Sequence, residues 1–189
     1  MNRIAFFAAA VVVALVAGPS SAQSYKADPV HSSAVFRLKH ANVSYFWGRF
    51  TAPTGTFTLD EADPTKSSFA VELQVGSVDT GNEKRDAHLK SPDFFNAKQY
   101  PTITFKSTAV KKGEGNLLAV TGDLTLHGVT KAVTVSVEPT GTGEFPKGTK
   151  RAGIEATVTV KMTDFEMKAM PGMLSDEVRI VVSFSGMGQ

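Results

Sequence analysis

Histidines are the side chains in this sequence best suited to chemistry, as metal ligands or as acid–base groups. The four histidines stand at positions 31, 40, 88 and 127. No pair has the i, i+4 spacing of a metal site on a helix or the i, i+2 spacing of one on a strand. His31 and His40 are an odd number of residues apart, so one regular strand would place them on opposite faces. The spacing therefore favours no metal site, and a metal- or haem-linked redox role stays open as an alternative.

Other catalytic patterns are also missing from the sequence. It contains no cysteine, which excludes thiol nucleophiles and zinc–thiolate sites. It has no G-x-S-x-G elbow, no S-x-x-K pair, no P-loop and no G-x-G-x-x-G. We therefore expect a protein that is not an enzyme and that has no cofactor.

Composition limits the partners that the protein can bind. The chain has 189 residues with a net charge of +2, and no basic run in it exceeds two residues. This distribution lacks the basic patch that binds nucleic acid. The hydrophobic content of 42% is sufficient for a packed core, and the length is typical of a single domain.

The first 22 residues are typical of a signal peptide. Arg3 precedes an uncharged apolar run over residues 4–17, and Ser20-Ser21-Ala22 supplies small residues at a cleavage site. The alternative is a transmembrane anchor, but the run is shorter than the ~20 residues that cross a bilayer. We expect cleavage after Ala22 and an exported, non-membrane-spanning mature domain over residues 23–189.

Alternation of apolar and polar residues is the main structural signal in the mature chain. Period-two alternation is typical of half-buried strands. Strands are predicted for residues 34–38, 57–59, 69–75, 103–105, 118–126, 133–137, 154–160 and 178–184. Eight such strands must bury their apolar faces against one another, which predicts an all-β fold, either a sandwich or a closed barrel.

Two segments interrupt this pattern and predict short helical connections. Thr80 and Glu83 have the spacing of a capping box, so a helix is expected over residues 84–90 before Pro92. Thr163 and Glu166 repeat that spacing, and residues 167–170 are expected to follow as a second short helix.

The inward faces of the predicted strands mix large and small side chains. Phenylalanines at several positions alternate in the pattern with small residues such as Ser107 and Ala109. A barrel of about eight strands is either filled by its side chains or wide enough for one small ligand. The pattern leaves both interiors open.

Three further groups of residues each have a structural and a functional interpretation. Arg85-Asp86 on the first helix is either an exposed pair or a charged rim that meets a ligand head group. Phe94 and Phe95 are expected to close the core or to line an opening. Methionines at 162, 167, 170 and 173 form an adaptable apolar segment, for which copper binding is conceivable.

Several segments together resemble the YceI family. They are Asp28-Pro29-Val30-His31-Ser32, residues 35–40, Gly48-Arg49-Phe50, residues 55–57, residues 85–95, residues 100–105, residues 122–131, Asp164-Phe165 and Asp176-Glu177-Val178. The resemblance extends over residues 24–185 in order. Where the family has glycine after Asp-Phe, this sequence has Glu166.

The resemblance implies a lipocalin-like antiparallel barrel that is exported to the periplasm. It further implies an elongated internal pocket for a long-chain isoprenoid or a similar amphiphile, and it supplies no catalytic residues. The residues that we expect to contact the ligand are Phe36, Leu38, Phe57, Val71, Leu73, Arg85, Phe94, Phe95, Phe105 and Phe184.

The sequence therefore leaves three functions open. The first is a carrier or store for a polyisoprenoid, a quinone or a fatty-chain lipid. The second is a redox component that uses the histidines with a metal or haem. The third is an interaction protein with a solid barrel whose loops bind a partner. The sequence leaves a homodimer open.

Overall fold

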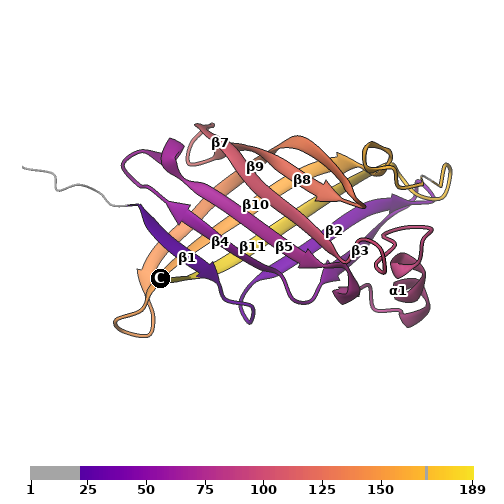
Figure 1. Ribbon diagram of the computed structural model, residues 1–189, viewed down its shortest axis with the longest axis horizontal. Helices are drawn as coiled ribbons and strands as arrows, with labels where there is room; N and C mark the ends of the chain where they lie inside the picture. Colours follow the sequence, from indigo (N-terminus) through magenta and orange to yellow (C-terminus); the bar gives the residue numbers. More distant parts are fainter. Residues whose placement is uncertain (1–21, 169) are drawn as a thin grey trace, which may run out of the picture.

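Antiparallel strands form a closed barrel in the computed structural model, which describes residues 22–168 and 170–189 (Figure 1). The strands are β1 (Gln23–Ala27), β2 (Ser33–His40), β3 (Ser44–Phe50), β4 (Thr54–Leu59), β5 (Ser68–Gln74), β6 (Val78–Asp79), β7 (Thr102–Lys112), β8 (Leu118–Leu126), β9 (Val129–Glu144), β10 (Lys150–Lys161) and β11 (Glu177–Gly188). The helical segments are α1 (Glu83–Lys90) and the 3-10 turns η1 (Pro64–Lys66), η2 (Val75–Ser77) and η3 (Met162–Phe165). Of the predicted signal peptide, residues 1–21 lie outside the described residues.

These eleven segments make up eight barrel strands, because three strands are interrupted. β1 and β2 pair in the same direction with successive parts of β11. β4 pairs with β1 and β3 with β2, so β3 and β4 form the next strand. β5 pairs with β4 and β6 with β3, which makes the third interrupted strand. The barrel closes where β1 pairs with β11, which confirms the antiparallel closed barrel of about eight strands.

Local contacts explain the interruptions. After β1, the Asp28 carboxylate accepts hydrogen bonds from the Val30 amide (3.0 Å) and the Arg151 guanidinium (2.8 Å). Between β3 and β4 the chain contains Pro53, which has no N–H to donate to a ladder. Between β5 and β6 it forms η2, where the Ser77 hydroxyl donates to the carbonyl of Gln74 at 2.7 Å. Sequence alternation missed β1, β3 and β6, each of which continues a strand that it did predict.

A β-bulge in β7 changes which of its side chains face the barrel interior. The register between β7 and β8 shifts between Ser107 and Ala109, so one additional residue is accommodated there. As a result Val110 is buried and Ala109 is exposed. The expectation that Ala109 faces inward was wrong because the alternation assumed an unbroken register.

One of the two predicted helices forms as a helix. The helix α1 begins after Asn82, whose side chain accepts a hydrogen bond from the Arg85 amide at 3.0 Å. Asn82, rather than Thr80, is therefore its N-cap residue. The second predicted helix does not form at residues 167, 168 and 170, because η3 ends at Phe165 and Glu166 adopts a left-handed conformation with φ of 54°; residue 169 lies outside the described residues. Within the described residues, no helix is both long and apolar enough to cross a membrane.

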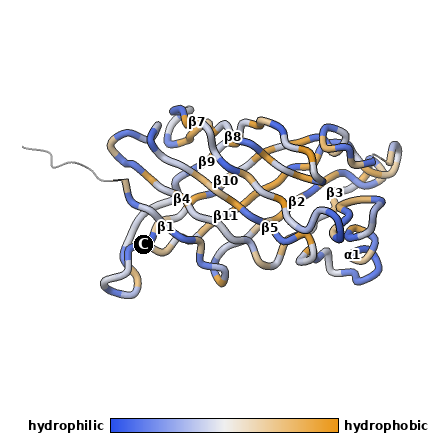
Figure 2. The backbone as a smooth tube through the Cα atoms, viewed as in Figure 1, coloured by the Kyte–Doolittle hydropathy of each residue, from blue (hydrophilic) through white to orange (hydrophobic). Residues whose placement is uncertain are grey.

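The two ends of the barrel differ. One end, called here the α1 end, carries α1, the β2–β3 hairpin and the segment between η3 and β11 (Figure 1). At the other end, called the packed end, the rings of Tyr25 and Phe57 stack with centroids 5.2 Å apart. A Cβ atom on Gly186 would lie only 2.5 Å from the Phe57 ring, so glycine is needed there for the ring to pack against the wall. Hydrophobic residues follow the strands, whereas α1 and many of the loops are hydrophilic (Figure 2).

Candidate functional site

The α1 end of the barrel contains a cavity of about 420 Å³. Its walls come from β2, β3, β5, β7, β8, β10, β11, α1, the loop that follows α1, η3 and the segment between η3 and β11. Most of the lining is aliphatic or aromatic, including Phe36 and Leu38 on β2 and Phe50 on β3. This volume lies within the roughly 300–1,000 Å³ that small-molecule sites occupy in proteins.

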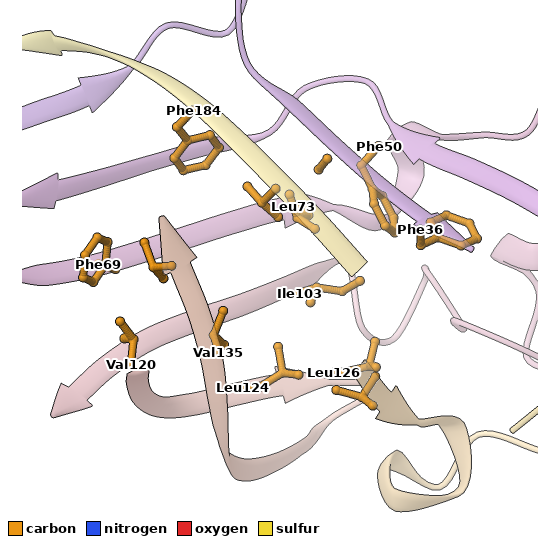
Figure 3. Close-up of a cluster of buried hydrophobic side chains, with 14 of the residues drawn as sticks. Phe36, Phe50, Phe69, Leu73, Ile103, Val120, Leu124, Leu126, Val135 and Phe184 are labelled. Atoms are coloured by element: carbon orange, nitrogen blue, oxygen red, sulfur yellow. The ribbon is translucent and has the colours of Figure 1, made fainter. Parts of the chain in front are cut away.

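A second, smaller cavity of about 70 Å³ lies next to the first. Both cavities are lined by Leu73, Ile103, Leu124 and Ile180, so these four side chains form the constriction between them. The remaining lining of the second cavity is apolar apart from Thr104. Leu73, Ile103 and Leu124 lie among the buried side chains in the barrel interior (Figure 3). The two cavities form an apolar path that narrows away from the α1 end.

Polar side chains in the first cavity include Arg85 from α1. The Arg85 guanidinium donates to the hydroxyl of Thr80 (2.8 Å) and to its carbonyl (2.7 Å). Its carbon atom Cζ also lies 4.4 Å from the centroid of the Phe46 ring, which is a cation–π contact. The guanidinium is thus held at the cavity by protein groups and can offer further N–H donors to a ligand.

Two histidines also line the first cavity, His40 at the end of β2 and His88 on α1. The His88 ring stacks edge-on against Phe94, with centroids 5.0 Å apart, and its Nε2 lies 3.3 Å from an oxygen of Asp93. His31 and His127 belong to other sites. His31 contacts Asp28 at 2.8 Å, and Nδ1 of His127 lies 3.2 Å from the carbonyl oxygen of Phe165.

The turn η3 and the segment between η3 and β11 cover part of the cavity with methionines. Met162 of η3 and Met167, Met170 and Met173 of the segment all line the cavity, and flexible thioether side chains adapt well to ligands of irregular shape. The Asp176 carboxylate fastens this segment by accepting hydrogen bonds from the amide (2.9 Å) and hydroxyl (2.7 Å) of Thr163. These bonds hold the pKa of Asp176 below its usual value. Across residues 22–168 and 170–189, no three His, Asp or Glu side chains are grouped as metal ligands.

The structure brings most of the candidate ligand contacts together. Those that line the first cavity are Phe36, Leu38, Leu73, Arg85, Phe94 and Phe95. Those that line the second are Val71, Leu73 and Phe105. Phe57 and Phe184 lie instead among the buried residues of the barrel and line neither cavity.

Sequence reasoning missed the contribution of β3 to the first cavity. Phe46 and Phe50 line the cavity from this strand. Phe46, Gly48 and Phe50 are every second residue of β3, so all three face the barrel interior. That period-two signal was present, but the large apolar residues Tyr45 and Trp47 on the opposite face obscured it.

Comparison with known proteins identifies the family of this barrel. The YceI-like domain matches residues 25–185. The chain is 44% identical over 175 residues to Protein YceI of Escherichia coli O157:H7, covering 92% of this chain and 91% of that protein. It is 42% identical, with the same coverage, to a UPF0312 protein of Pseudomonas aeruginosa strain LESB58.

Solved structures show the same architecture. BcnA of Burkholderia cenocepacia superposes with a TM-score of 0.77 at 25% identity, covering 84% of this chain and 98% of BcnA. The Campylobacter jejuni YCEI protein gives 0.72 at 27% identity, with coverages of 80% and 90%. A polyisoprenoid binding domain from Saccharophagus degradans gives 0.66 at 18% identity, with coverages of 87% and 98%, and thus shares the fold. Since the domain match and the relatives both extend over most of the sequence, the chain belongs to the YceI-like family.

Proposed function

We propose that this protein is an exported carrier or store that binds one long-chain amphiphile inside the barrel. The observation that carries the proposal is the apolar path of two cavities, which narrows from the α1 end toward the packed end. Burial of a hydrocarbon chain there is favourable at about 25 cal/mol per Å² of apolar surface removed from water. The likeness to the polyisoprenoid binding domain supports this class of ligand.

The polar part of the ligand lies, in this proposal, beside Arg85 and His88. Both side chains line the first cavity, called here the wide cavity. The second cavity, called the narrow cavity, offers only Thr104 as a polar residue. A ligand with one polar head and one apolar chain therefore has a single favourable orientation. A polyisoprenoid, a quinone with an isoprenoid tail and a fatty-chain lipid all have this form.

Two cavities inside the barrel also support a binding role over the alternative of a solid barrel. The residues that separate the cavities are all aliphatic, so the constriction can accept a hydrocarbon chain without desolvating a charge. We further propose that residues 1–22 direct export to the periplasm and that the mature domain performs no catalysis.

Lipid analysis of the purified protein tests the proposal directly. The full-length chain is expressed in a Gram-negative host, and the mature protein is isolated from the periplasm. Native mass spectrometry is expected to show one additional mass of a lipid, and organic extraction should release it. The delipidated protein is then titrated with geranylgeraniol, a short-tailed ubiquinone and palmitamide.

A substitution that fills the first cavity, paired with the same substitution at an exposed position, provides a matched control. Leu38→Trp adds an indole to the lining of the first cavity, whereas Val30→Trp adds the same group at an exposed position. Only Leu38→Trp should reduce lipid recovery and probe binding. Repeated isolation of empty wild-type protein that also binds none of the probes would overturn the proposal.

A further inference from the structure

Large apolar side chains are exposed beside the wide cavity. Val43 is 86% exposed, Trp47 53%, Tyr45 51% and Met173 50%. Val43 belongs to the β2–β3 hairpin and the two aromatic residues to β3. The hairpin lies against Met173, since the amide of Ala41 donates to the Met173 carbonyl at 2.7 Å. These four residues therefore form one apolar surface at the α1 end.

Basic side chains lie beside this apolar surface. Arg37 on β2 stands directly opposite Arg179 on β11, and Lys39 stands opposite Tyr45. Like charges in direct cross-strand positions repel each other. In the part of the chain that the structure describes, neither Arg37 nor Arg179 forms an ion pair. An anionic partner would relieve this repulsion.

The acidic side chains near this surface stand beside basic residues. The Asp79 carboxylate forms an ion pair with the Arg49 guanidinium, with 2.7 Å between nitrogen and oxygen. Glu177 stands opposite Lys161 on the neighbouring strand. The Arg37 guanidinium lies 4.0 Å from the Tyr45 ring centroid and 5.6 Å from that of Trp47. Cationic and aromatic groups are thus interleaved on one outer face.

This outer face is continuous with the cavity opening. Arg37 alternates along β2 with Phe36 and Leu38, which line the cavity. Tyr45 and Met173 belong to both the exposed surface and the cavity lining. A partner that contacts the face would therefore lie next to the opening through which a ligand enters.

We propose that this face, formed by Arg37, Lys39, Val43, Tyr45, Trp47, Met173 and Arg179 and called here the docking face, binds the surface of an anionic lipid bilayer. Tyr and Trp favour the boundary between hydrocarbon and water, and basic residues are attracted to anionic head groups. Docking would place the cavity opening against the membrane from which the ligand is taken or to which it is delivered. That consequence rests on the proposed function, whereas bilayer binding is measured independently of it.

The single tryptophan of the chain provides the measurement, since Trp47 is the only one. Vesicles of phosphatidylethanolamine and phosphatidylglycerol are added to the mature protein at low ionic strength. The Trp47 emission is expected to shift to shorter wavelength as the indole leaves water, and the protein should sediment with the vesicles. Binding should weaken in high salt because salt screens the attraction. Vesicles of phosphatidylcholine alone should bind much less protein.

Variants at the two ends of the barrel give matched controls. Each cation near an anionic surface contributes roughly fivefold in affinity, so Arg37→Gln with Arg179→Gln should weaken sedimentation about thirtyfold. Lys111→Gln with Lys112→Gln removes the same charge from the β7–β8 hairpin and should change it less than about twofold. All four positions are on the surface, and circular dichroism verifies that the variants fold.

The apolar contribution is tested in the same way. Val43→Ser with Met173→Ser should reduce vesicle binding and the Trp47 shift. Phe145→Ser removes an exposed apolar side chain from the β9–β10 hairpin and should change neither.

Three results would overturn the inference: no vesicle binding at low salt, equal binding to the neutral vesicles, or equal losses for the control variants. A fourth such result would come from sedimentation velocity. If Val43→Ser converts a stable dimer into a monomer, a second copy of the chain covers the face instead. Binding of geranylgeraniol in detergent, without vesicles, separates the two proposals. Vesicle binding without ligand binding refutes only the carrier, and the reverse refutes only the docking face.

Discussion

Leu73 on β5 and Ile103 on β7 are direct cross-strand partners, and both line each of the two cavities. Side chains directly opposite on neighbouring strands have Cβ atoms about 5 Å apart. The pair therefore forms one side of the constriction through which an apolar chain would pass from the wide cavity to the narrow one. Substitution of either residue should therefore affect ligand binding more than folding.

Leu73→Lys is expected to give a folded protein that no longer binds lipid. The amino group can extend into the adjoining wide cavity and remain hydrated there, but it would place a charge beside the hydrocarbon chain. Circular dichroism and geranylgeraniol titration measure the two effects. Val120→Lys is the comparison, because Val120 is fully buried and lines neither cavity. It should unfold, and equal behaviour of the two variants would contradict the assignment of Leu73 to the constriction.

Phe184→Ala should destabilise the protein more than Phe36→Ala. Phe184 is buried outside both cavities, and truncation of a packed phenylalanine costs about 3–5 kcal/mol. For a domain of this length, that loss lowers the Tm by roughly 10 °C. Phe36 borders a cavity, so its removal leaves fewer lost contacts and a bound lipid can fill the space. Thermal melts with and without lipid should show recovery for Phe36→Ala alone.

Arg85→Ala should weaken binding of lipids with a polar head about ten- to a hundredfold. A hydrogen bond that involves a charged group contributes about 1.5–3 kcal/mol, and the guanidinium lies in the cavity lining. A hydrocarbon without a head group, such as squalene, should bind the variant and the wild type equally. Equal affinities for both kinds of ligand would make Arg85 a structural residue that only holds Thr80 and Phe46.

Glu166→Gly should stabilise the protein by about 1 kcal/mol. Glu166 has a φ of 54°, a left-handed conformation that glycine adopts without steric strain. Glu166→Ala removes the same carboxylate but keeps the Cβ atom, so it should give no comparable gain. Urea denaturation of the three proteins decides this, and a gain for Ala that matches that for Gly would locate the effect in the charge.

Asp28 should make the stability of the protein depend on pH in the acidic range. The hydrogen bond from Arg151, followed by that from His31, holds the pKa of the Asp28 carboxyl well below its usual range. Its contribution to stability is therefore present above the unfolded-state pKa of about 4 and is lost as the pH falls toward the folded-state value. Asp28→Asn should lower the Tm at pH 7, and the difference from wild type should shrink below pH 4. A difference that does not depend on pH would contradict this role.

The sequence by itself determined the fold class and most inward-facing positions. Whether a residue of a regular strand faces the core depends only on its parity, which is a local property. Phe36, Leu73 and Phe105 could therefore be assigned to the interior without knowledge of the strand order. Parity failed at the bulge after Ser107, because an inserted residue is specified by the pairing with β8 and not by the alternation.

Tertiary structure decided which inward side chains border the cavities. Phe36 and Phe184 have the same parity signal, yet Phe36 lines the wide cavity and Phe184 does not. Their difference lies in their height along the barrel, which depends on how each strand is staggered against its neighbours. Likewise, Ala41 and Met173 are far apart in the sequence, and a hydrogen bond joins them only because the β2–β3 hairpin lies against the segment before β11. Such contacts depend on the closure of the whole barrel, so no local pattern could have specified them.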